Sequence, residues 1–348
     1  MNPIIELYRG IAALMVMACH YRPIVFGDER NWLSFLWTGV DFFFVISGFV
    51  FAPHIASGKI QLRSFSVRRF FRIYPLYFLS LWIYFFLRPD DPNKLHYLFN
   101  HLGMLHTLHS KEEAFFFNPA YWSLPPEIEF YLLLPLLALW VRSSLNKLLW
   151  IMLFALITNL VLFTLHLENQ DVKIFSILTV HLPVLLIEFL LGVLTFHFSQ
   201  SRPLAFAPAL VLLAIATGAL GYLGWYFVKF GDAGISNHPI LKLSFNLFCA
   251  LAYAIILGVS VNLANQRVPS KKLLIVAFFG GQISYSVYLL HNAMPLLFAR
   301  ISMSPLPRFF LCSLVTITFA FILNKLYEHP LHQLGITLSK RLGSPTKQ

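Results

Sequence analysis

The stretch IIELYRGIAALMVMACHYRPIV, residues 4–25, is long and apolar enough to cross a bilayer as a helix. It carries Arg9 and His20, which are eleven positions apart. Eleven residues are close to three helical turns, so both side chains project from one face, about 16 Å apart along the axis. A cation and an imidazole at membrane depth are costly and usually serve a site or an internal partner. The run has no small-residue cleavage site, which indicates a retained span and not a signal peptide.

Similar apolar runs recur along the whole chain of 348 residues. Hydrophobic residues make up 58% of the sequence and charged residues only 12%. This composition excludes an ordinary soluble domain, whose charged share is about a quarter. We predict an all-α polytopic membrane protein with about ten transmembrane helices. The expected spans are residues 4–25, 34–56, 73–88, 120–141, 148–166, 174–197, 207–228, 240–262, 274–298 and 308–327.

The distribution of charge predicts the topology. With the N and C termini cytoplasmic, the cytoplasmic segments are basic and contain no acidic residue, which satisfies the positive-inside bias. Their basic residues are Lys59, Arg63, Arg68, Arg69, Arg72, Arg142, Lys147, Arg202, Arg267, Lys271, Lys272, Lys340, Arg341 and Lys347. The acidic residues on the outer side are Asp28, Glu29, Asp90, Asp91, Glu112, Glu113, Glu168, Asp171 and Asp232. The net charge of +11 therefore reports membrane topology, and we expect no nucleic-acid partner.

The chain is predicted to form one membrane-embedded domain over residues 1–335, followed by a short basic cytoplasmic tail over residues 336–348. Residues 57–72 are expected to form a basic cytoplasmic segment and residues 89–119 a polar outer loop. The spacing of the loop histidines matches no compact zinc signature, so we expect no metal there. These histidines are His96, His101, His106 and His109. The three cysteines, Cys19, Cys249 and Cys312, lie in apolar spans and are expected to act as small apolar residues.

Arg9 and His20 allow two interpretations. In the structural one, Arg9 snorkels to the cytoplasmic headgroups and His20 makes one interhelical hydrogen bond. In the functional one, Arg9 holds an anionic group near the inner face and His20 acts on an acyl group or a hydroxyl. Imidazole suits this work because its pKa lies near neutrality. The separation along the helix also resembles the length of a pantetheine arm, which suggests a coenzyme A thioester entering from the cytoplasm.

A second group of arginines lies in VRRFFRIYP, residues 67–75. Arg69 and Arg72 are three apart, so on a helix they share a face and can clamp phosphates. The alternative is that Arg68, Arg69 and Arg72 anchor the third span by the positive-inside bias. Because the cluster and Arg9 fall at the same membrane face, we favour phosphate binding.

Two carboxylates are expected within the outer half of the membrane. Asp41, in GVDFFFVISGF (residues 39–49), would be costly if unpaired and is expected to face a partner or a wet cavity. In YWSLPPEIEFY (residues 121–131) the two prolines suit a helix start, which places Glu127 where the helix dipole stabilises an anion. The alternative interpretation is that Glu127 occupies this position only because the helix dipole stabilises its charge, without a role in a site.

The neighbours of Glu127 divide between two helix faces. Tyr131 shares a face with Glu127, whereas Glu129 points elsewhere. Three further polar residues have simple structural interpretations. Glu188 is expected to pair with a neighbouring helix or to be neutral, His291 to be a satisfied interhelical group, and Glu328 to pair with a cytoplasmic arginine.

Together these residues predict acyl transfer across the membrane. A cationic entrance suits a phosphorylated donor from the cytoplasm, and an imidazole with carboxylates suits a hydroxyl acceptor from the outer side. His20 is the proposed general base or transient acyl acceptor, and one sequence does not separate these roles. Asp41 or Glu127 is expected to orient the imidazole. Arg9, Arg68, Arg69 and Arg72 are expected to bind the donor.

The quoted residues resemble the acyltransferase-3 family of bacterial inner-membrane O-acyltransferases. Its Arg-x10-His element matches Arg9 and His20, and its Arg-x-x-Arg element matches Arg69 and Arg72. Further elements match residues 39–49, Trp122 to Glu127 with Phe130-Tyr131, Ser284 to His291, and Glu328 to Pro330. The matches follow the family order over nearly the whole chain. Ile128 and Glu129 replace a more usual glutamate-glutamine pair, and His329 stands where lysine is frequent.

The resemblance implies ten spans in a bacterial inner membrane and an acyl-CoA co-substrate, most often acetyl-CoA. It also implies a carbohydrate hydroxyl acceptor at the outer face, either a cell-surface polysaccharide or a lipid-linked glycan. The residues tied to activity in the family correspond here to His20, Arg9, Arg69 and Arg72. No metal cofactor is expected.

Two other classes of function compete with an enzyme. A proton-coupled secondary transporter or glycan flippase would use buried Asp, Glu and His as proton relays. Transporters commonly show broken helices in both halves, whereas this chain has one Pro-Pro interruption, at Pro125-Pro126, without a counterpart. A non-catalytic membrane scaffold predicts that Arg9 and His20 tolerate substitution.

Overall fold

The computed structural model describes residues 2–169, 171–201 and 203–343, and these are helical with no strand among them. Ten helical segments are long and apolar enough to cross a membrane, which confirms the predicted architecture. Arg202 and Lys347 lie outside the described residues. The long helices are α1 (Pro3–Phe26), α3 (Gly39–Ser57), α4 (Leu62–Leu87), α7 (Leu124–Val141), α8 (Leu145–Glu168), α10 (Leu182–Ser199), α11 (Phe206–Asn237), α12 (Leu241–Ala264), α13 (Lys271–Leu290), α15 (Pro305–Leu323) and α16 (His329–Gly343).

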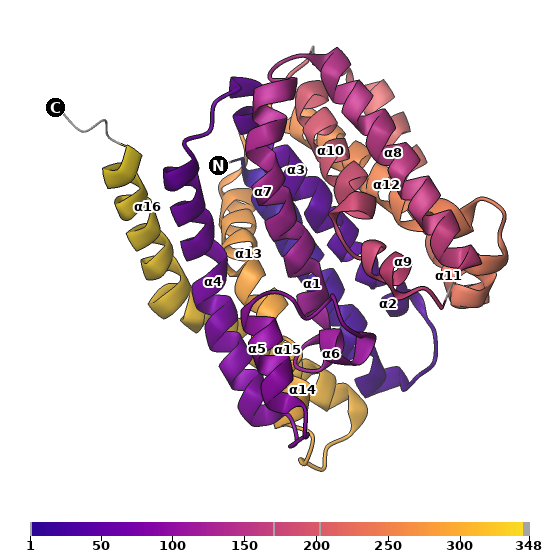
Figure 1. The fold of residues 1–348 in the computed structure, drawn as a ribbon, viewed down its shortest axis with the longest axis vertical. Coiled ribbons are helices and arrows are strands. Elements are labelled where there is room, and N and C mark those ends of the chain that lie inside the picture. The colour runs from indigo at the N-terminus through magenta and orange to yellow at the C-terminus, as the bar shows by residue number, and fades with distance from the viewer. Residues whose placement is uncertain (1, 170, 202, 344–348) are drawn as a thin grey trace.

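Short elements connect these helices, mostly at the ends of the bundle (Figure 1). They are α2 (Trp32–Phe35), η1 (Leu36–Thr38), α5 (Lys94–Leu102), α6 (Lys111–Phe115), η2 (Pro119–Ser123), α9 (Lys173–Leu178), α14 (Ala293–Leu297) and the π-helical turn η3 (Asn324–Glu328). The predicted outer loop over residues 89–119 therefore contains α5 and α6.

The third membrane helix begins earlier than the sequence indicated. Helix α4 starts at Leu62, so most of the predicted basic segment over residues 57–72 is helical and continuous with the third membrane helix. Gly58 ends α3 in a left-handed conformation (φ 68°), and after a short connection no glycine or proline interrupts the helix before Pro75. The arginines of the cluster consequently sit on regular helical turns, where their long side chains can reach inward.

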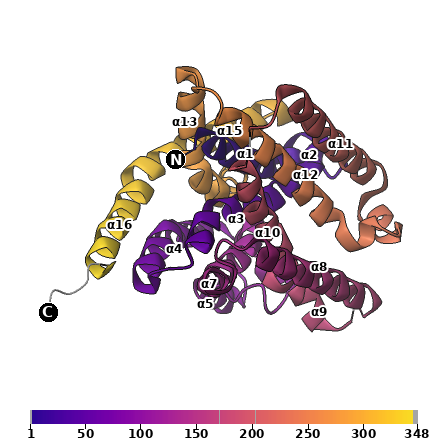
Figure 2. The ribbon, with the colours of Figure 1, turned by 90° about the horizontal axis from the view of Figure 1, so that it is seen from above.

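The C-terminal segment is helical beyond the predicted domain boundary at residue 335. Helix α16 runs to Gly343 and packs along α4, and both views show the two helices side by side (Figures 1 and 2). Gly335 permits this approach, because an added Cβ atom would lie 2.4 Å from the Cβ atom of Phe71. Residues 336–343 of the predicted tail are therefore part of a packed helix.

Helix α1 packs against α3, α12, α13 and α15 (Figure 2). Its closest approach to α13 is at Gly10, where a Cβ atom would lie 2.9 Å from the Cα atom of Gly280. Small residues let helix backbones come this close in membranes. Both helices rise by the same amount per residue. If α1 and α13 run in the same direction, residues about ten positions after Gly10 and Gly280 therefore lie at the same height and can meet again.

Helices α3 and α10 make a second tight contact. A Cβ atom on Gly48 would lie 1.8 Å from the carbonyl oxygen of Phe189, and one on Gly192 would lie 1.9 Å from that of Val45. Both obstacles are backbone atoms that cannot move independently of their helices. This contact fixes which face of α3 points toward α10.

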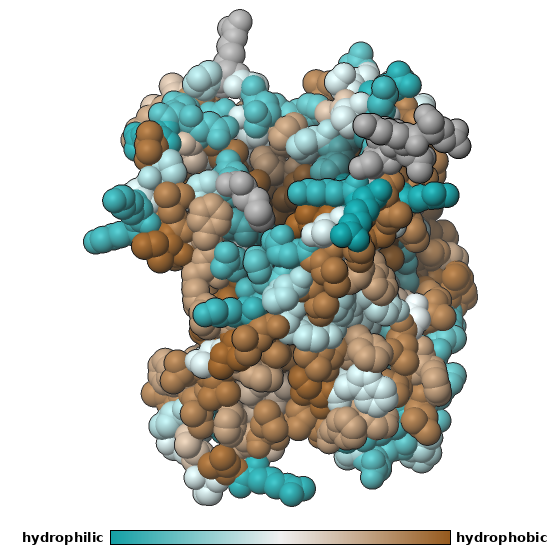
Figure 3. All heavy atoms as spheres, turned by 90° about the vertical axis from the view of Figure 1, so that its left-hand side faces the viewer, coloured by the Kyte–Doolittle hydropathy of each residue, from teal (hydrophilic) through white to brown (hydrophobic). Residues whose placement is uncertain are grey.

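Apolar side chains cover the outside of the bundle. On α4 the side chains of Phe70, Phe78 and Phe86 are exposed. Figure 3 shows brown apolar residues over the lower part of one face and teal hydrophilic residues gathered higher up. This surface suits contact with lipid, as the membrane-length helices require.

Candidate active site

His20 on α1 and His291, directly after α13, meet at the same end of the parallel helix pair. The Nδ1 atom of His20 lies 2.6 Å from the Nε2 atom of His291. The ring planes differ by only 7° and the centroids are 4.9 Å apart. The centroids are much further apart than the two nitrogen atoms, although the ring planes are nearly parallel. The rings therefore meet edge to edge and are not stacked face to face. This is the geometry of an in-plane N–H···N hydrogen bond.

The surrounding hydrogen bonds assign the protons of this pair. The Nδ1 atom of His291 lies 3.0 Å from the carbonyl oxygen of Val287. A carbonyl only accepts, so Nδ1 of His291 carries a proton and its Nε2 atom is the acceptor in the neutral ring. His20 therefore donates from Nδ1, and its Nε2 atom keeps the free lone pair. This leaves one basic nitrogen with a fixed direction.

Two asparagines support the histidine pair. Asn292 donates from Nδ2 to Oδ1 of Asn118 over 2.8 Å, and the same Nδ2 atom lies 3.2 Å from Nδ1 of His20. Asn118 Oδ1 also caps η2 by accepting from the Ala120 N–H over 3.0 Å. Asn292 is thus placed to donate to His20 whenever the shared proton rests on His291. Sequence reasoning missed both asparagines, because neither shows a periodic signal.

The arginines gather toward the opposite end of α1. Arg72 donates to Glu328 over 2.6 Å, which confirms the predicted pairing of Glu328 with an arginine. Arg9 lies 3.6 Å from Glu6 and is near enough to Arg72 for the two positive charges to repel one another. Arg69 also interacts with Arg72. The structure therefore brings the predicted arginines of α1 and α4 into one cluster.

Unlike Arg9 and Arg72, Arg69 has no carboxylate partner among the residues that the structure describes, and its neighbour in the cluster is the phenol of Tyr131. Its guanidinium carbon lies 5.0 Å from the ring centroid of Phe51, and its buried Nε atom has no hydrogen-bond partner. Arg68, by contrast, donates to the hydroxyl of Ser64 over 2.8 Å. Arg69 is therefore the guanidinium most available to an anionic ligand.

Glu127 lies between the arginine cluster and the histidine pair. Its Oε1 atom accepts hydrogen bonds from the hydroxyls of Tyr131 and Ser47, the latter over 3.4 Å. It also interacts electrostatically with Arg9 and Tyr288. Ser47 is near the middle of α3, so the Glu127 carboxylate lies beside the middle of that helix.

Glu127 and Tyr131 share a helix face as predicted, and Glu129 points elsewhere. Glu129 accepts hydrogen bonds from Nδ1 of His181 and, over 2.8 Å, from the Leu182 N–H. Glu129 therefore joins α7 to the start of α10 and has no contact with the candidate site.

Asp41 does not orient His20. Gly39 faces α1, where its added Cβ atom would lie 2.9 Å from the carbonyl oxygen of Ala12, and Asp41 is two residues further on. Two residues turn a helix by about 200°, so Asp41 points away from α1. Its carboxylate accepts from Asn246 on α12 over 3.3 Å. The hydrogen-bond partners of His20 are His291 and Asn292, so the expectation for Asp41 or Glu127 as direct partners is wrong.

The other face of α3 borders the candidate site. Phe43 contacts Tyr288, Ser47 contacts Glu127, and Phe51 contacts Arg69. These positions are four residues apart and so form one stripe. Phe43 and Ser47 are half-buried, whereas the residues around them, including Asp41 and Gly48, are buried. The stripe runs from the arginine cluster toward the histidine pair, and we call it the front face of α3.

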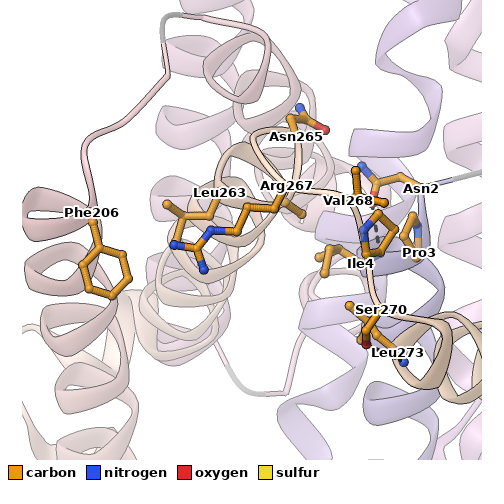
Figure 4. Close-up of a pocket in the computed structure, with 12 residues that line it drawn as sticks. Asn2, Pro3, Ile4, Phe206, Leu263, Asn265, Arg267, Val268, Ser270 and Leu273 are labelled. Carbon is orange, nitrogen blue, oxygen red and sulfur yellow. Dashed lines mark hydrogen bonds between the residues drawn. The ribbon is translucent and has the colours of Figure 1, made fainter.

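Two cavities lie away from this stripe. One, of about 460 Å³, is lined by Asn2 and Ile4 of α1 together with the segment from Leu263 to Leu273 and with Phe206 of α11. Figure 4 shows Arg267 extending toward Phe206 across this space. The other, of about 160 Å³, is bordered by α8, α10, α11 and α12. No group of three or more His, Cys, Asp or Glu side chains within residues 2–169, 171–201 and 203–343 is arranged to hold a metal ion.

Ten membrane-length helices around a hydrogen-bonded imidazole pair and an arginine cluster define a polytopic membrane protein with an internal polar site. The acyltransferase domain family matches residues 2–325, and the chain belongs to this family. The resemblance to the acyltransferase-3 family is thereby confirmed, and membership indicates acyltransferase activity. No curated protein and no solved structure matches the chain.

Proposed function

We propose that the protein transfers an acyl group, with acetyl expected, from cytoplasmic acyl-CoA to a hydroxyl of a cell-surface polysaccharide or a lipid-linked glycan. It would act as a multi-pass enzyme of a bacterial inner membrane. The observation that carries the proposal is the His20–His291 bond of 2.6 Å, which leaves Nε2 of His20 as a directed base within a membrane acyltransferase.

The arginine cluster supports binding of the donor. Coenzyme A carries phosphates at one end and the thioester at the other. Arg69, with Arg72, Arg9 and Arg68 beside it, offers guanidinium groups that suit phosphate oxygens. About 16 Å of α1 separates Arg9 from His20, a distance that suits an extended pantetheine arm along the front face of α3.

His20 would move one proton in each cycle. Nε2 takes the proton of the acceptor hydroxyl, and the oxygen attacks the thioester carbonyl carbon. The tetrahedral intermediate collapses by breaking the carbon–sulfur bond, and the thiolate takes the proton from the imidazolium. The His291 Nε2 lone pair stabilises the imidazolium through the bond to Nδ1 of His20. In the alternative route the Nε2 lone pair attacks the thioester carbonyl carbon, and the carbon–sulfur bond breaks to release the thiolate. The acceptor hydroxyl then attacks the acyl-imidazole carbon, which frees Nε2, and its proton passes to the thiolate.

Glu127 would act on this route through other groups. It accepts from Tyr131 and interacts with Arg9 and Tyr288, so it links the donor end to the His20 end. We assign it a positioning role. Asp41 has no place in this reaction because it lies on the opposite face of α3.

The test is release of coenzyme A thiol by the purified protein in liposomes, with acetyl-CoA and a glycan acceptor. We expect thiol release with the wild type and its loss in His20→Ala, while insertion and thermal stability persist. His197→Ala on α10 is the matched control and should retain the rate. A transporter, a flippase or a scaffold would release no thiol. A scaffold would also tolerate the substitution of His20. Near-normal release by His20→Ala contradicts the proposal.

A further inference from the structure

Two buried carboxyl groups lie near one another behind α3, on the side away from the front face. Asp41 on α3 is fully buried and Glu188 on α10 is 1% exposed. Cys249 on α12 lies near both of them. The close contact at Gly48 and Gly192 holds α3 and α10 together beside this pair.

The oxygen atoms around this pair lack donors. Asp41 Oδ2, Glu188 Oε2 and Asn159 Oδ1 are buried and have no hydrogen-bond partner. Asn159 is held in place because its Nδ2 atom donates over 3.0 Å to the carbonyl oxygen of Val184, one turn before Glu188. Three acceptors without a donor require a ligand that supplies positive charge or hydrogen.

A cavity borders Glu188 and Asn159 directly, and it borders Asn246, which donates a hydrogen bond to Asp41. Glu188, Asn159 and Asn246 line the space of about 160 Å³ between α8, α10 and α12. Asp232 and Lys242, from the neighbouring ends of α11 and α12, also border it. By the predicted topology this end of the bundle is the outer one, so the cavity would admit a small solute from outside.

Charge decides what the cavity holds. Neither Asp41 nor Glu188 forms an ion pair with a cationic side chain in the described part of the chain. Two carboxylates buried near one another without a counter-ion would each lose hydration and would also repel one another. A proton neutralises one carboxylate and a Na⁺ ion attracts both, so either cation offsets the repulsion.

We propose that Asp41, Glu188 and Asn159 form a binding site for one monovalent cation, Na⁺ or a proton, taken up through this cavity. A divalent ion fits less well, because Ca²⁺ and Mg²⁺ take six or more oxygen ligands. The site lies outside the acyl-transfer chemistry and does not depend on it.

The bound cation stabilises the contact between α3 and α10. Without it, two like charges act across an interface whose backbones are in contact at Gly48 and Gly192. The front face of α3, with Phe43, Ser47 and Phe51, borders the acyl-transfer site. Cation occupancy behind α3 thereby supports the position of the residues in front of it.

The test is the thermal unfolding temperature of the purified full chain in detergent, measured in NaCl and in choline chloride of equal ionic strength. If Na⁺ is the ligand, NaCl should raise the unfolding temperature of the wild type by about 2–4 °C at ten or more times the Kd. The increase should vanish in Asp41→Asn and in Glu188→Gln. Asp232→Asn, which removes an exposed carboxylate at the same cavity, is the matched control and should keep it.

If the ligand is a proton, the difference in unfolding temperature between the wild type and Asp41→Asn/Glu188→Gln should change with pH and not with Na⁺. A carboxyl group that holds its proton more tightly in the folded protein stabilises the fold at low pH. This stabilisation is lost as pH rises. Other titrating groups near the pair are present in both proteins, so their contributions cancel in this difference. These groups are Cys249 and Tyr253 on α12 and Asp232 and Lys242 at the cavity.

Two results overturn the proposal. One is a difference between the wild type and the double variant that depends on neither Na⁺ nor pH. The other is an unfolding temperature that rises with free hexoses but not with Na⁺ or acid. That result would show that the unpartnered oxygens accept hydrogen bonds from sugar hydroxyls. If Asp41→Asn does not fold, Glu188→Gln supports the same comparisons.

Discussion

The Nδ1 atom of His20 lies 2.6 Å from the Nε2 atom of His291, across 271 positions of sequence. The two rings are nearly coplanar, and the carbonyl oxygen of Val287 fixes the tautomer of His291. A histidine that the sequence indicated as a structural group is therefore the partner of the candidate base. It takes the orienting place that a carboxylate occupies in many catalytic triads.

Replacing His291 should reduce acyl transfer without weakening donor binding. We expect His291→Ala to lower kcat about 10²–10³-fold, because His20 loses its fixed tautomer and its acceptor. KM for acyl-CoA should stay near the wild-type value. His291→Gln should recover part of the rate, since its amide oxygen can accept from Nδ1 of His20. If both variants lost the same fraction of kcat and both also lost thermal stability, His291 would have a structural role only.

The glycine contact between α1 and α13 should control the register of the histidine pair. Gly10→Ala places a Cβ atom 2.9 Å from the Cα atom of Gly280 and must push the helices apart. A shift of about 1 Å at a catalytic group can cost about 10²-fold in rate, so we expect a large loss of thiol release. Gly280→Ala is the matched control, because its Cβ atom would lie at an ordinary 3.5 Å from Gly10. Similar rates for the two variants would contradict this account.

Arg72 and Glu328 should behave as a structural ion pair. Glu328 is 2% exposed and pairs with Arg72 over 2.6 Å. Arg72→Gln leaves this carboxylate without its counter-ion and should lower the free energy of unfolding by about 3–5 kcal/mol. Adding Glu328→Gln should restore most of the loss, as measured by thermal unfolding. A double variant as unstable as the sum of the single variants would show that the two residues are not coupled.

Arg69 should matter for donor binding more than for stability. It has no carboxylate partner among the described residues, so Arg69→Gln leaves no buried anion behind. We expect KM for acyl-CoA to rise about tenfold, which corresponds to the loss of one charge-assisted contact of about 1.4 kcal/mol. Initial rates against acyl-CoA concentration give this value. Arg63→Gln at the exposed start of α4 is the control, and an equal increase there would argue for a general charge effect.

The outer segment around α5 should lose stability in acid. His101 and His106 are buried with their ring centroids 4.2 Å apart. Burial lowers the pKa of His106 from 6.5 to about 4 and that of His101 well below its usual range. The unfolded segment therefore binds protons first as pH falls from about 6.5 to about 4, at about 1.4 kcal/mol per pH unit for each histidine.

Hydrogen exchange of residues 94–118 at a series of pH values measures this loss. His106→Gln should make the exchange less dependent on pH, whereas His96→Gln, at an exposed position, should not. Unchanged protection in the wild type from about pH 6.5 to about pH 4 would contradict the prediction.

Features that are local to one helix followed from the sequence. Apolar length predicted ten membrane helices, and helical periodicity predicted that Glu127 and Tyr131 share a face while Glu129 turns away. The joint position of Arg69 and Arg72 also followed from their spacing. These features depend on one helix and its solvent, both of which can be read from consecutive residues.

Contacts between helices were decided by the tertiary structure. The pairing of His20 with His291 depends on where Gly10 and Gly280 let two backbones meet. The turning of Asp41 toward Asn246 depends on which face of α3 packs against α1. In lipid, apolar faces do not select their partners by hydrophobicity, so close packing of small residues sets the arrangement. Such packing joins distant segments and leaves no periodic signal along the chain.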